Sequence, residues 1–310
     1  MNRINPILPT NKLYGPKNYF NDLKTFYDRK KFPKTILLSG KRGLGKFTLI
    51  YHFINYLFSK DTYDISNNLI DLNSKTYLEI SNGIFENLIY LKNDTEKKIG
   101  IDDIRTLKDI ILKSTLNQKE RFIILDNVEK FNISSSNALL KIIEEPSEKN
   151  HFILIDNQEN KLIETIASRC FKINYFLNKS DKLSIIKQLI NHHKVDKLIE
   201  YEDSDITPGD YLNFNNICLE EGINPNLDYI AKVIKLLNLF KKSKNKTYID
   251  MSIFFTERLF YKLSLNKKND ILLLNNIKIN TIKTINDFVL YNLNINSVTR
   301  SIISHLDYGK

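Results

Sequence analysis

The sequence predicts an α/β domain with a parallel sheet over residues 1–176, followed by a region made of helices alone. Short continuous apolar runs rich in β-branched residues recur through the first half of the chain. Such runs are typical of strands that are covered on both faces of a parallel sheet. Helical patterns separate the runs, and this alternation indicates a doubly wound fold. From Asn178 onward nearly every segment has the pattern of an amphipathic helix, so the sheet should end close to that residue.

Five apolar runs are the predicted strands, and three helical patterns lie between them. The strands are 35–38, which is followed closely by Gly40, then 88–91, 122–125, 152–155 and 171–176. The helices are 46–58, 102–116 and 134–145. Serines suited to capping stand at the start of the last helix, and Pro146 ends it. The polar, Asn-rich residues 60–80 are predicted to form a surface loop.

The second half divides at a break in the helical pattern. Its clearest helices are 181–192, 229–240 and 249–265, and the break is the Thr-Pro-Gly-Asp sequence at 207–210. Proline and glycine together interrupt a helical pattern more strongly than any other residues. We therefore predict three domains: the α/β domain at 1–176, a small helical domain at 177–215 and a second helical domain at 216–310.

Composition and charge limit the class of protein. The chain has 310 residues, of which 42% are hydrophobic, and this is enough to bury a sizeable core. Neither a signal-peptide core nor an apolar run near the roughly 18 residues of a membrane span is present, so we expect a cytoplasmic protein with no membrane partner. Cys170 and Cys218 are the only cysteines, so we expect reduced thiols, with no disulfide framework and no zinc or other metal cluster.

The formal net charge of +10 suggests an acidic partner such as nucleic acid. The same lysine excess, together with abundant Asn and Ile, is also what AT-rich coding produces. The sequence contains no local stripe of Lys and Arg, so the charge alone leaves direct DNA contact open.

The sharpest motif is a glycine-rich turn that contains Gly40, Gly43 and Gly45 and ends at Lys46. It lies between a predicted strand and a predicted helix. In that context glycines let backbone N–H groups surround a phosphate, while the lysine and the helix N-terminus supply positive potential. The alternative is a plain glycine turn, but the strand-to-helix context favours the ancestry of a phosphate-binding loop, or P-loop.

Two departures from that motif argue against metal-dependent hydrolysis. The residue after the lysine should be Ser or Thr, whose hydroxyl binds Mg²⁺, but Phe47 stands there and Thr48 comes one place late. One position on a helix rotates a side chain by about 100°, so Thr48 should not reach the same metal. Asp126 ends a predicted strand and suits Mg²⁺, but Asn127 follows it where ring-forming ATPases place a glutamate that orients the attacking water. Glu129, two residues further on, is not a predictable substitute.

Several segments, taken in order, resemble the clamp-loader ATPases of bacterial DNA polymerase III, which are AAA+ type P-loop proteins. The resemblance is specific over residues 33–175 and weaker beyond. The segments that carry it are Ser-Asn-Ala-Leu-Leu-Lys-Ile-Ile-Glu-Glu-Pro at 136–146, the apolar run 151–155, the stretch 162–170 that ends in Ser168-Arg169-Cys170, and the helix start at 101–105. The terminal segment 296–306 also resembles the last helix of such subunits.

The resemblance implies roles for two further residues. Within that family the Ser-Arg-Cys arginine reaches across a subunit interface to the γ-phosphate of ATP held by a neighbour, so Arg169 would be an arginine finger acting in trans. A fixed guanidinium stabilises the charge that develops on a transferred phosphoryl group. Without this context, an arginine at a surface turn would be a solvated charge. Asn157 falls near the family's sensor position, and residues 177–215 and 216–310 would be its lid and collar domains.

The pattern of losses resembles the delta-prime type of subunit. The hydrolysing subunits have Ser or Thr after the lysine, Glu after the aspartate, a four-cysteine zinc module and a lid arginine. This sequence lacks all four, and Asp210 stands where the lid arginine is expected. The resemblance therefore implies a non-hydrolysing component of the DNA polymerase III holoenzyme. Its partners would be the ATPase (gamma/tau) and delta subunits and, through the complex, the sliding clamp and primed DNA.

No cofactor is required by this interpretation, and the sequence leaves open weak binding of ATP or ADP. Two alternatives stay open as well. One is an active P-loop ATPase, either the motor subunit or a helicase loader, and the other is a basic nucleic-acid-binding module without enzymatic activity.

Overall fold

The computed structural model describes residues 9–93, 98–113, 115, 117–265 and 270–307. Contacts divide the chain into two compact units. The first contains the residues through His193 together with Thr207–Asp210, and the second contains Lys194–Ile206 together with the residues from Tyr211 onward. The functional division into three domains stays a prediction.

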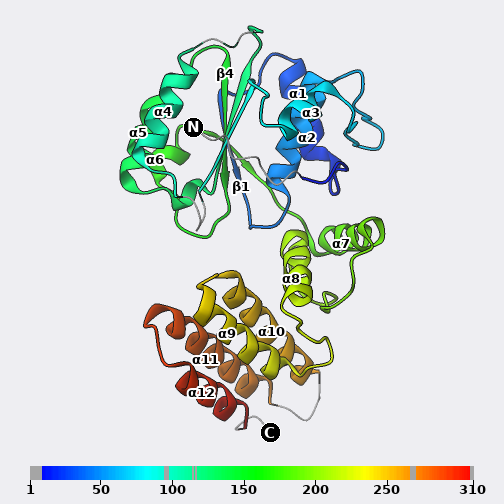
Figure 1. The fold of residues 1–310 in the computed structure, drawn as a ribbon, viewed down its shortest axis with the longest axis vertical. Helices are drawn as coiled ribbons and strands as arrows, with labels where there is room; N and C mark the ends of the chain where they lie inside the picture. Colours follow the sequence, from blue (N-terminus) through cyan, green and yellow to red (C-terminus); the bar gives the residue numbers. More distant parts are fainter. Residues whose placement is uncertain (1–8, 94–97, 114, 116, 266–269, 308–310) are drawn as a thin grey trace. The chain divides into compact units, whose positions relative to one another are not determined.

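A five-stranded parallel sheet with the order β2–β3–β4–β1–β5 is the centre of the first unit (Figure 1). Its strands are β1 (Thr35–Ser39), β2 (Leu88–Lys92), β3 (Arg121–Asp126), β4 (Asn150–Asp156) and β5 (Phe171–Asn174). Every residue of β1, β3 and β4 is buried, which accounts for their continuous apolar runs. The predicted parallel sheet is confirmed.

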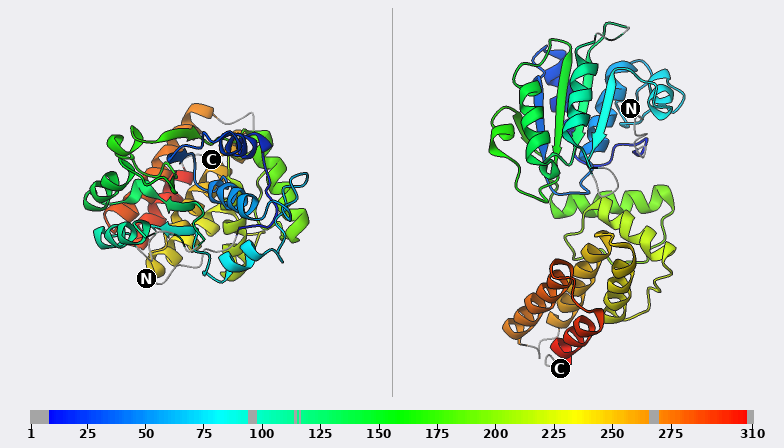
Figure 2. Two further views of the ribbon diagram at one scale, coloured as in Figure 1. Left: turned by 90° about the horizontal axis from the view of Figure 1, so that it is seen from above. Right: turned by 60° about the vertical axis from the view of Figure 1, so that its left-hand side comes forward.

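Helices cover both faces of this sheet (Figures 1 and 2). One face carries α1 (Lys17–Asp28), α2 (Lys46–Phe58) and α3 (Lys75–Ser81), and the other carries α4 (Ile101–Ile111), α5 (Ile133–Ile143) and α6 (Glu164–Ala167). A short 3₁₀ turn, η1 (Val128–Lys130), follows β3, and α7 (Lys179–His193) follows β5. The predicted α/β class is therefore confirmed, with the core between the sheet and each helical layer.

Three local predictions need correction. Asn132, not a serine, caps α5, because its side chain accepts the N–H of Ser135 at 2.7 Å. The helix predicted to reach Leu116 ends at Ile111, and Leu116 itself lies outside the described residues. Residues 60–80 are not a simple surface loop, because they include nearly all of α3 and the buried side chains Tyr63 and Ile70.

The break predicted at 207–210 is a helix start. Pro208 is the first residue of α8 (Pro208–Glu220). Proline suits this position because the N–H that it lacks would have no partner within the helix. The first three residues of α8 belong to the first unit, and the rest of the helix belongs to the second.

The second unit is helical, as predicted. Besides most of α8 it contains α9 (Tyr229–Ser243), α10 (Thr247–Ser264), α11 (Ile271–Leu290) and α12 (Ile295–Asp307). In sequence order, each of these last four helices packs against the next, and α12 returns to α9 (Figure 2). Leu236, Met251 and Ile285 are fully buried between them. None of the described helices has both the length and the apolar character that crossing a bilayer requires.

His52, buried on α2, is expected to make the fold sensitive to acid. Its Nδ1 lies 3.0 Å from the Tyr63 hydroxyl and its Nε2 lies 3.0 Å from the Thr10 carbonyl oxygen. Since a carbonyl only accepts, the neutral ring donates from Nε2 and accepts at Nδ1. Burial lowers the pKa of His52 to about 4, against the opposing effect of the Thr10 carbonyl. In the unfolded chain the pKa is about 6.5.

Between these two pKa values the unfolded state binds the extra proton. The free energy of unfolding therefore falls by about 3 kcal/mol as the pH drops from 6.5 to 4 through this group alone. Urea unfolding at pH 7.0 and 4.5 should show this loss in the wild type and a clearly smaller one in His52→Gln. The exposed His193→Gln is the matched control. An equal pH dependence in His52→Gln and wild type would contradict the assignment.

Candidate functional site

The glycine-rich loop connects β1 to α2, as its sequence predicts. Gly43 and Gly45 have φ angles of +77° and +91°, in the left-handed region that favours glycine. Gly45 is also the N-cap of α2. Gly40 is needed for space, since a Cβ there would lie 2.2 Å from the carbonyl oxygen of Tyr175.

Lys46, the first residue of α2, is buried and turned into the loop. Its Nζ donates to the carbonyl oxygens of Gly40 and, at 2.8 Å, of Lys41. Burial lowers the pKa of Lys46 to about 8, although nearby carboxylates, led by Asp126 and Asp156, oppose the shift. The ammonium group is thus stabilised by the loop's own carbonyls, and a phosphate would have to compete with them.

The residue after the loop lysine, where a hydroxyl would bind Mg²⁺, is the aromatic Phe47, and it packs on a second aromatic residue, Tyr90. The Phe47 ring stacks on Tyr90 of β2 with centroids 4.4 Å apart and planes at 30°. The Tyr90 hydroxyl donates to Asp126 Oδ2 at 3.1 Å. Thr48 is half-buried at the next position of α2. Phe47 therefore supplies no hydroxyl ligand for a metal, and the Tyr90 hydroxyl is already donated to the carboxylate that would bind one.

Asp126 accepts hydrogen bonds from three donors. Besides Tyr90, its Oδ1 accepts the backbone N–H of Asn127 at 2.9 Å and the Asn157 side-chain amide at 3.2 Å. Asn127 adopts a left-handed conformation with φ of 59°, and its Nδ2 donates to the Asn93 carbonyl oxygen at 2.6 Å. Its Oδ1 accepts from Asn157 at 2.5 Å. Both amides are fixed by this network, and neither can accept a proton from water.

Two buried carboxylates adjoin this network. Glu129 on η1 accepts the N–H of Asn157 through Oε2 at 3.2 Å, and burial raises its pKa. Asp156 at the end of β4 accepts the Ser39 hydroxyl at 2.6 Å and the N–H of Gln158 at 2.9 Å. The structure thus gathers acids at the carboxyl ends of β3 and β4, around the position of Lys46.

Asp210 also interacts electrostatically with Lys46. It is in the first turn of α8, where its carboxylate accepts the Thr207 hydroxyl at 2.7 Å. Burial raises the pKa of Asp210, while Arg42 and Lys46 act to lower it. Where the family resemblance places a lid arginine, this chain has a carboxylate that would repel a triphosphate.

Arg169 lies just past α6, next to the C-terminal end of α5, where Glu144 is the C-cap. Its Nε donates to Glu144 Oε1 at 2.8 Å and its Nη1 donates to the Thr165 carbonyl oxygen at 3.0 Å. The side chain is 39% exposed. Within the described residues no contact joins Arg169 to the loop, so the structure brings together Lys46, Asp126 and Asn157 but not Arg169.

Tyr90, Asn93 and Glu144 are site residues that the sequence analysis did not identify. Tyr90 and Asn93 come from β2 and its end, more than thirty residues from Asp126 and Asn127 along the chain. Glu144 was noted only as part of a family motif. Since their roles depend on contacts between elements distant in sequence, no local pattern could have indicated them.

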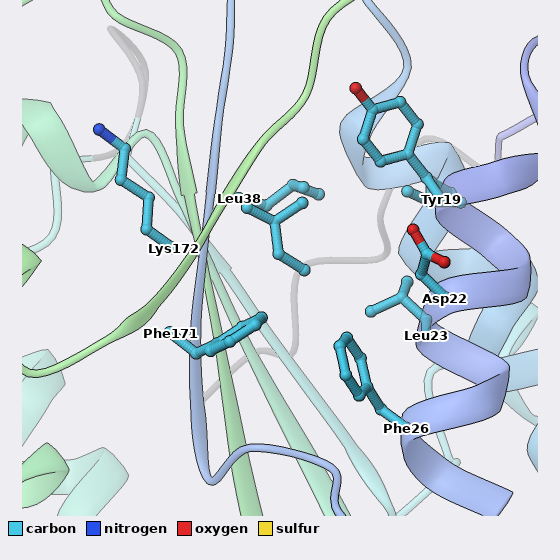
Figure 3. A pocket seen from close by; sticks show the side chains of 9 residues that line it. Tyr19, Asp22, Leu23, Phe26, Leu38, Phe171 and Lys172 are labelled. Carbon is cyan, nitrogen blue, oxygen red and sulfur yellow. The ribbon is translucent and has the colours of Figure 1, made fainter.

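A separate apolar cleft of about 210 Å³ lies between α1 and β5 (Figure 3). Tyr19, Leu23 and Phe26 line one side of it, and Phe171 lines the other. Asp22 and Lys172 are the charged side chains in its lining. Because no residue of the glycine-rich loop lines it, this cleft is distinct from the phosphate-loop site.

The family model described as "DNA polymerase III, delta subunit" matches residues 15–178. The delta' subunit of Buchnera aphidicola (subspecies Schizaphis graminum) is 35% identical over 147 residues, which are 47% of this chain and 43% of that protein. The tau subunit of Bacillus subtilis is 26% identical over 284 residues, covering 80% of this chain and 49% of that one. The matches thus span less than half the length of these relatives.

Among solved structures, a DNA polymerase III gamma subunit-related protein from Thermotoga maritima is similar over 93% of this chain and 99% of its own. Its TM-score is 0.47 and its sequence identity is 17%.

Proposed function

Because this chain belongs to the family of DNA polymerase III delta subunits, we propose that it is the delta-prime subunit of a clamp loader. In this role it does not hydrolyse ATP itself. It presents Arg169 to ATP held by a neighbouring gamma/tau subunit while the sliding clamp is loaded onto primed DNA during replication. The delta subunit would be a further partner in the same complex.

The proposal rests mainly on Asp126, because both of its carboxylate oxygens already accept hydrogen bonds. A Mg²⁺-nucleotide needs an open carboxylate oxygen and a hydroxyl after the loop lysine. Here Tyr90 donates to one carboxylate oxygen, two nitrogen donors share the other, and Phe47 replaces the hydroxyl. Hydrolysis further needs a group that orients water, and the side-chain amide of Asn127 is held by Asn93 and Asn157. These residues do not fit a hydrolytic magnesium site.

The geometry of Arg169 supports its proposed role in trans. The ion pair with Glu144 and the bond to the Thr165 carbonyl use Nε and Nη1. Within the described residues the two N–H donors of Nη2 make no hydrogen bond, and the arginine side chain that carries them is partly exposed. A guanidinium held at two of its nitrogens loses little further entropy when it meets a phosphate. Arg169 would therefore already be oriented when it contacts the γ-phosphate of ATP on a neighbouring subunit.

The second unit has the surface that an assembly domain needs. Large apolar side chains at the two ends of α11 are strongly exposed, among them Leu272 at 77% and Leu290 at 71%. Ile271 and Tyr291 beside them are also exposed. Neighbouring exposed apolar side chains, such as those at each end of α11, are a mark of protein contact surfaces. We propose that this unit acts as the collar domain and packs there against its counterparts in the other subunits.

The purified chain alone should hydrolyse ATP no faster than background. Lys46→Ala should leave that rate unchanged, because in this proposal the lysine serves no hydrolytic site. The measurement is phosphate release with Mg²⁺ and ATP, with the exposed Lys141→Ala of α5 as the matched control. Turnover that disappears only in Lys46→Ala would contradict the proposal and favour an active P-loop ATPase.

A further inference from the structure

We propose that the phosphate-binding loop of this chain is a docking site for the chain's own first turn of α8. This contact, rather than a nucleotide, holds the loop in its observed conformation. The loop carbonyl oxygen of Gly43 accepts the backbone N–H of Gly209 at 2.8 Å. Both residues belong to the first compact unit. The inference goes beyond the role proposed for Arg169 and does not depend on it.

The two segments approach so closely that only glycine fits on either side. A Cβ on Gly209 would lie 2.8 Å from the Cα and 3.0 Å from the carbonyl oxygen of Gly43. A Cβ on Gly43 would lie 2.1 Å from the Thr207 hydroxyl oxygen. Real Cβ atoms do not come this close to backbone atoms, so any larger residue at position 209 must force the segments apart. The glycine at 43 therefore serves this contact as well as the loop's backbone conformation.

The first turn of α8 is prepared for this contact by its own sequence. The Thr207 hydroxyl oxygen accepts the N–H of Asp210 at 3.3 Å, which is the geometry of an N-cap. Pro208 contributes no N–H. Of the N–H groups that a helix start usually leaves without partners, Asp210 donates to the cap and Gly209 donates to the loop. The two elements that commonly bind phosphate, a glycine loop and a helix N-terminus, here bind each other.

The charged side chains near this contact have partners within the chain, so they need no phosphate to stabilise them. Lys46 is satisfied by the carbonyl oxygens of Gly40 and Lys41. Asp210 lies within the electrostatic reach of Arg42 and Lys46, which act to lower its pKa against the effect of burial.

Hydrogen exchange of the Gly209 amide, which donates to the Gly43 carbonyl oxygen at 2.8 Å, tests the proposal in the full chain. Without nucleotide this amide should exchange slowly, and 5 mM ADP should change its rate less than twofold. Gly209→Ala should speed exchange of the amide at position 209 at least tenfold, because the added Cβ separates α8 from Gly43. Thr207→Ala, which removes the cap without adding bulk, should speed it in the same direction. Gly100→Ala is the control, because its Cβ would have its nearest neighbour at 3.7 Å.

Two results would overturn the inference. One is rapid exchange of the wild-type Gly209 amide that ADP slows strongly, since the nucleotide would then order this contact. The other is unchanged exchange in both Gly209→Ala and Thr207→Ala. Circular dichroism of each variant identifies any that fails to fold, and Thr207→Ala then decides. ATP turnover reports on the proposed function separately, so the two can fail independently.

Discussion

Replacing Arg169 with alanine should sharply lower ATP hydrolysis at one site of a clamp loader reconstituted with this chain. An arginine finger stabilises the charge on the transferred phosphoryl group and is worth about 10³–10⁵ in rate. In the proposed arrangement Arg169 acts only on the ATP next to this chain, so the burst of hydrolysis on clamp and primed DNA should lose one site's share. Assembly should persist, because Arg169 is a partly exposed side chain whose hydrogen bonds, among the residues that the structure describes, are to Glu144 and Thr165.

Arg105→Ala is the matched control for this experiment. Arg105 is also an exposed arginine in an ion pair, with Asp102 at 2.9 Å, but it lies on α4 and has no proposed role. Arg169→Lys keeps the positive charge and loses the planar fork of donors, so it should not restore the rate. Size-exclusion chromatography checks assembly. A normal burst of ATP hydrolysis from an intact complex that contains Arg169→Ala would contradict the proposed arginine-finger role.

Phe122→Ala should be among the most destabilising single substitutions in the first unit. Phe122 on β3 is fully buried, and its ring stacks on His151 with centroids 5.3 Å apart. Phe32, Phe53 and Phe58 meet the same ring edge-on. Removing a buried phenyl ring typically costs about 3–5 kcal/mol, because transfer energy is lost and a cavity remains. The loss should appear as a lower urea midpoint with an unchanged slope.

Phe176→Ala is the control for the same chemical change at the surface. Phe176 is 66% exposed, and its described hydrogen bonds to Tyr19 use backbone atoms that alanine keeps. Its substitution should therefore change the free energy of unfolding by about 0.5 kcal/mol or less. Equal losses in Phe122→Ala and Phe176→Ala would show that this aromatic cluster is not a main source of stability.

Phe47 and Asn127, the two residues that depart from the pattern of a hydrolysing P-loop site, are connected to each other through other residues. Phe47 packs on Tyr90, and Tyr90 donates to Asp126. Asn127 is held by Asn157, which donates to the same carboxylate. A hydroxyl at position 47 or a glutamate at position 127 would therefore still leave Asp126 occupied. Restoring a magnesium site would require changes at Tyr90 as well.

Much of the fold could be predicted because its signals are local. The strands ending at Ser39, Asp126 and Asp156 are buried along their whole length, so their apolar runs are continuous and easy to recognise. The cap of α5 was missed because Asn132 and the serines that follow it are all good capping residues. The buried Tyr63 and Ile70 were missed because their polar neighbours dominate the pattern of residues 60–80.

The sequence by itself determined which chemical groups the chain has: the loop glycines, Lys46, the losses at Phe47 and Asn127, and Arg169. These depend on residue type and on spacing along one strand–turn–helix, which local backbone preferences largely fix. Only the tertiary structure decided what those groups contact. Tyr90 reaches Asp126 across neighbouring strands, Glu144 orients Arg169, and Gly209 comes within hydrogen-bonding distance of Gly43. Such contacts join residues 25 to 166 positions apart, and they form only when the whole sheet and its helices pack.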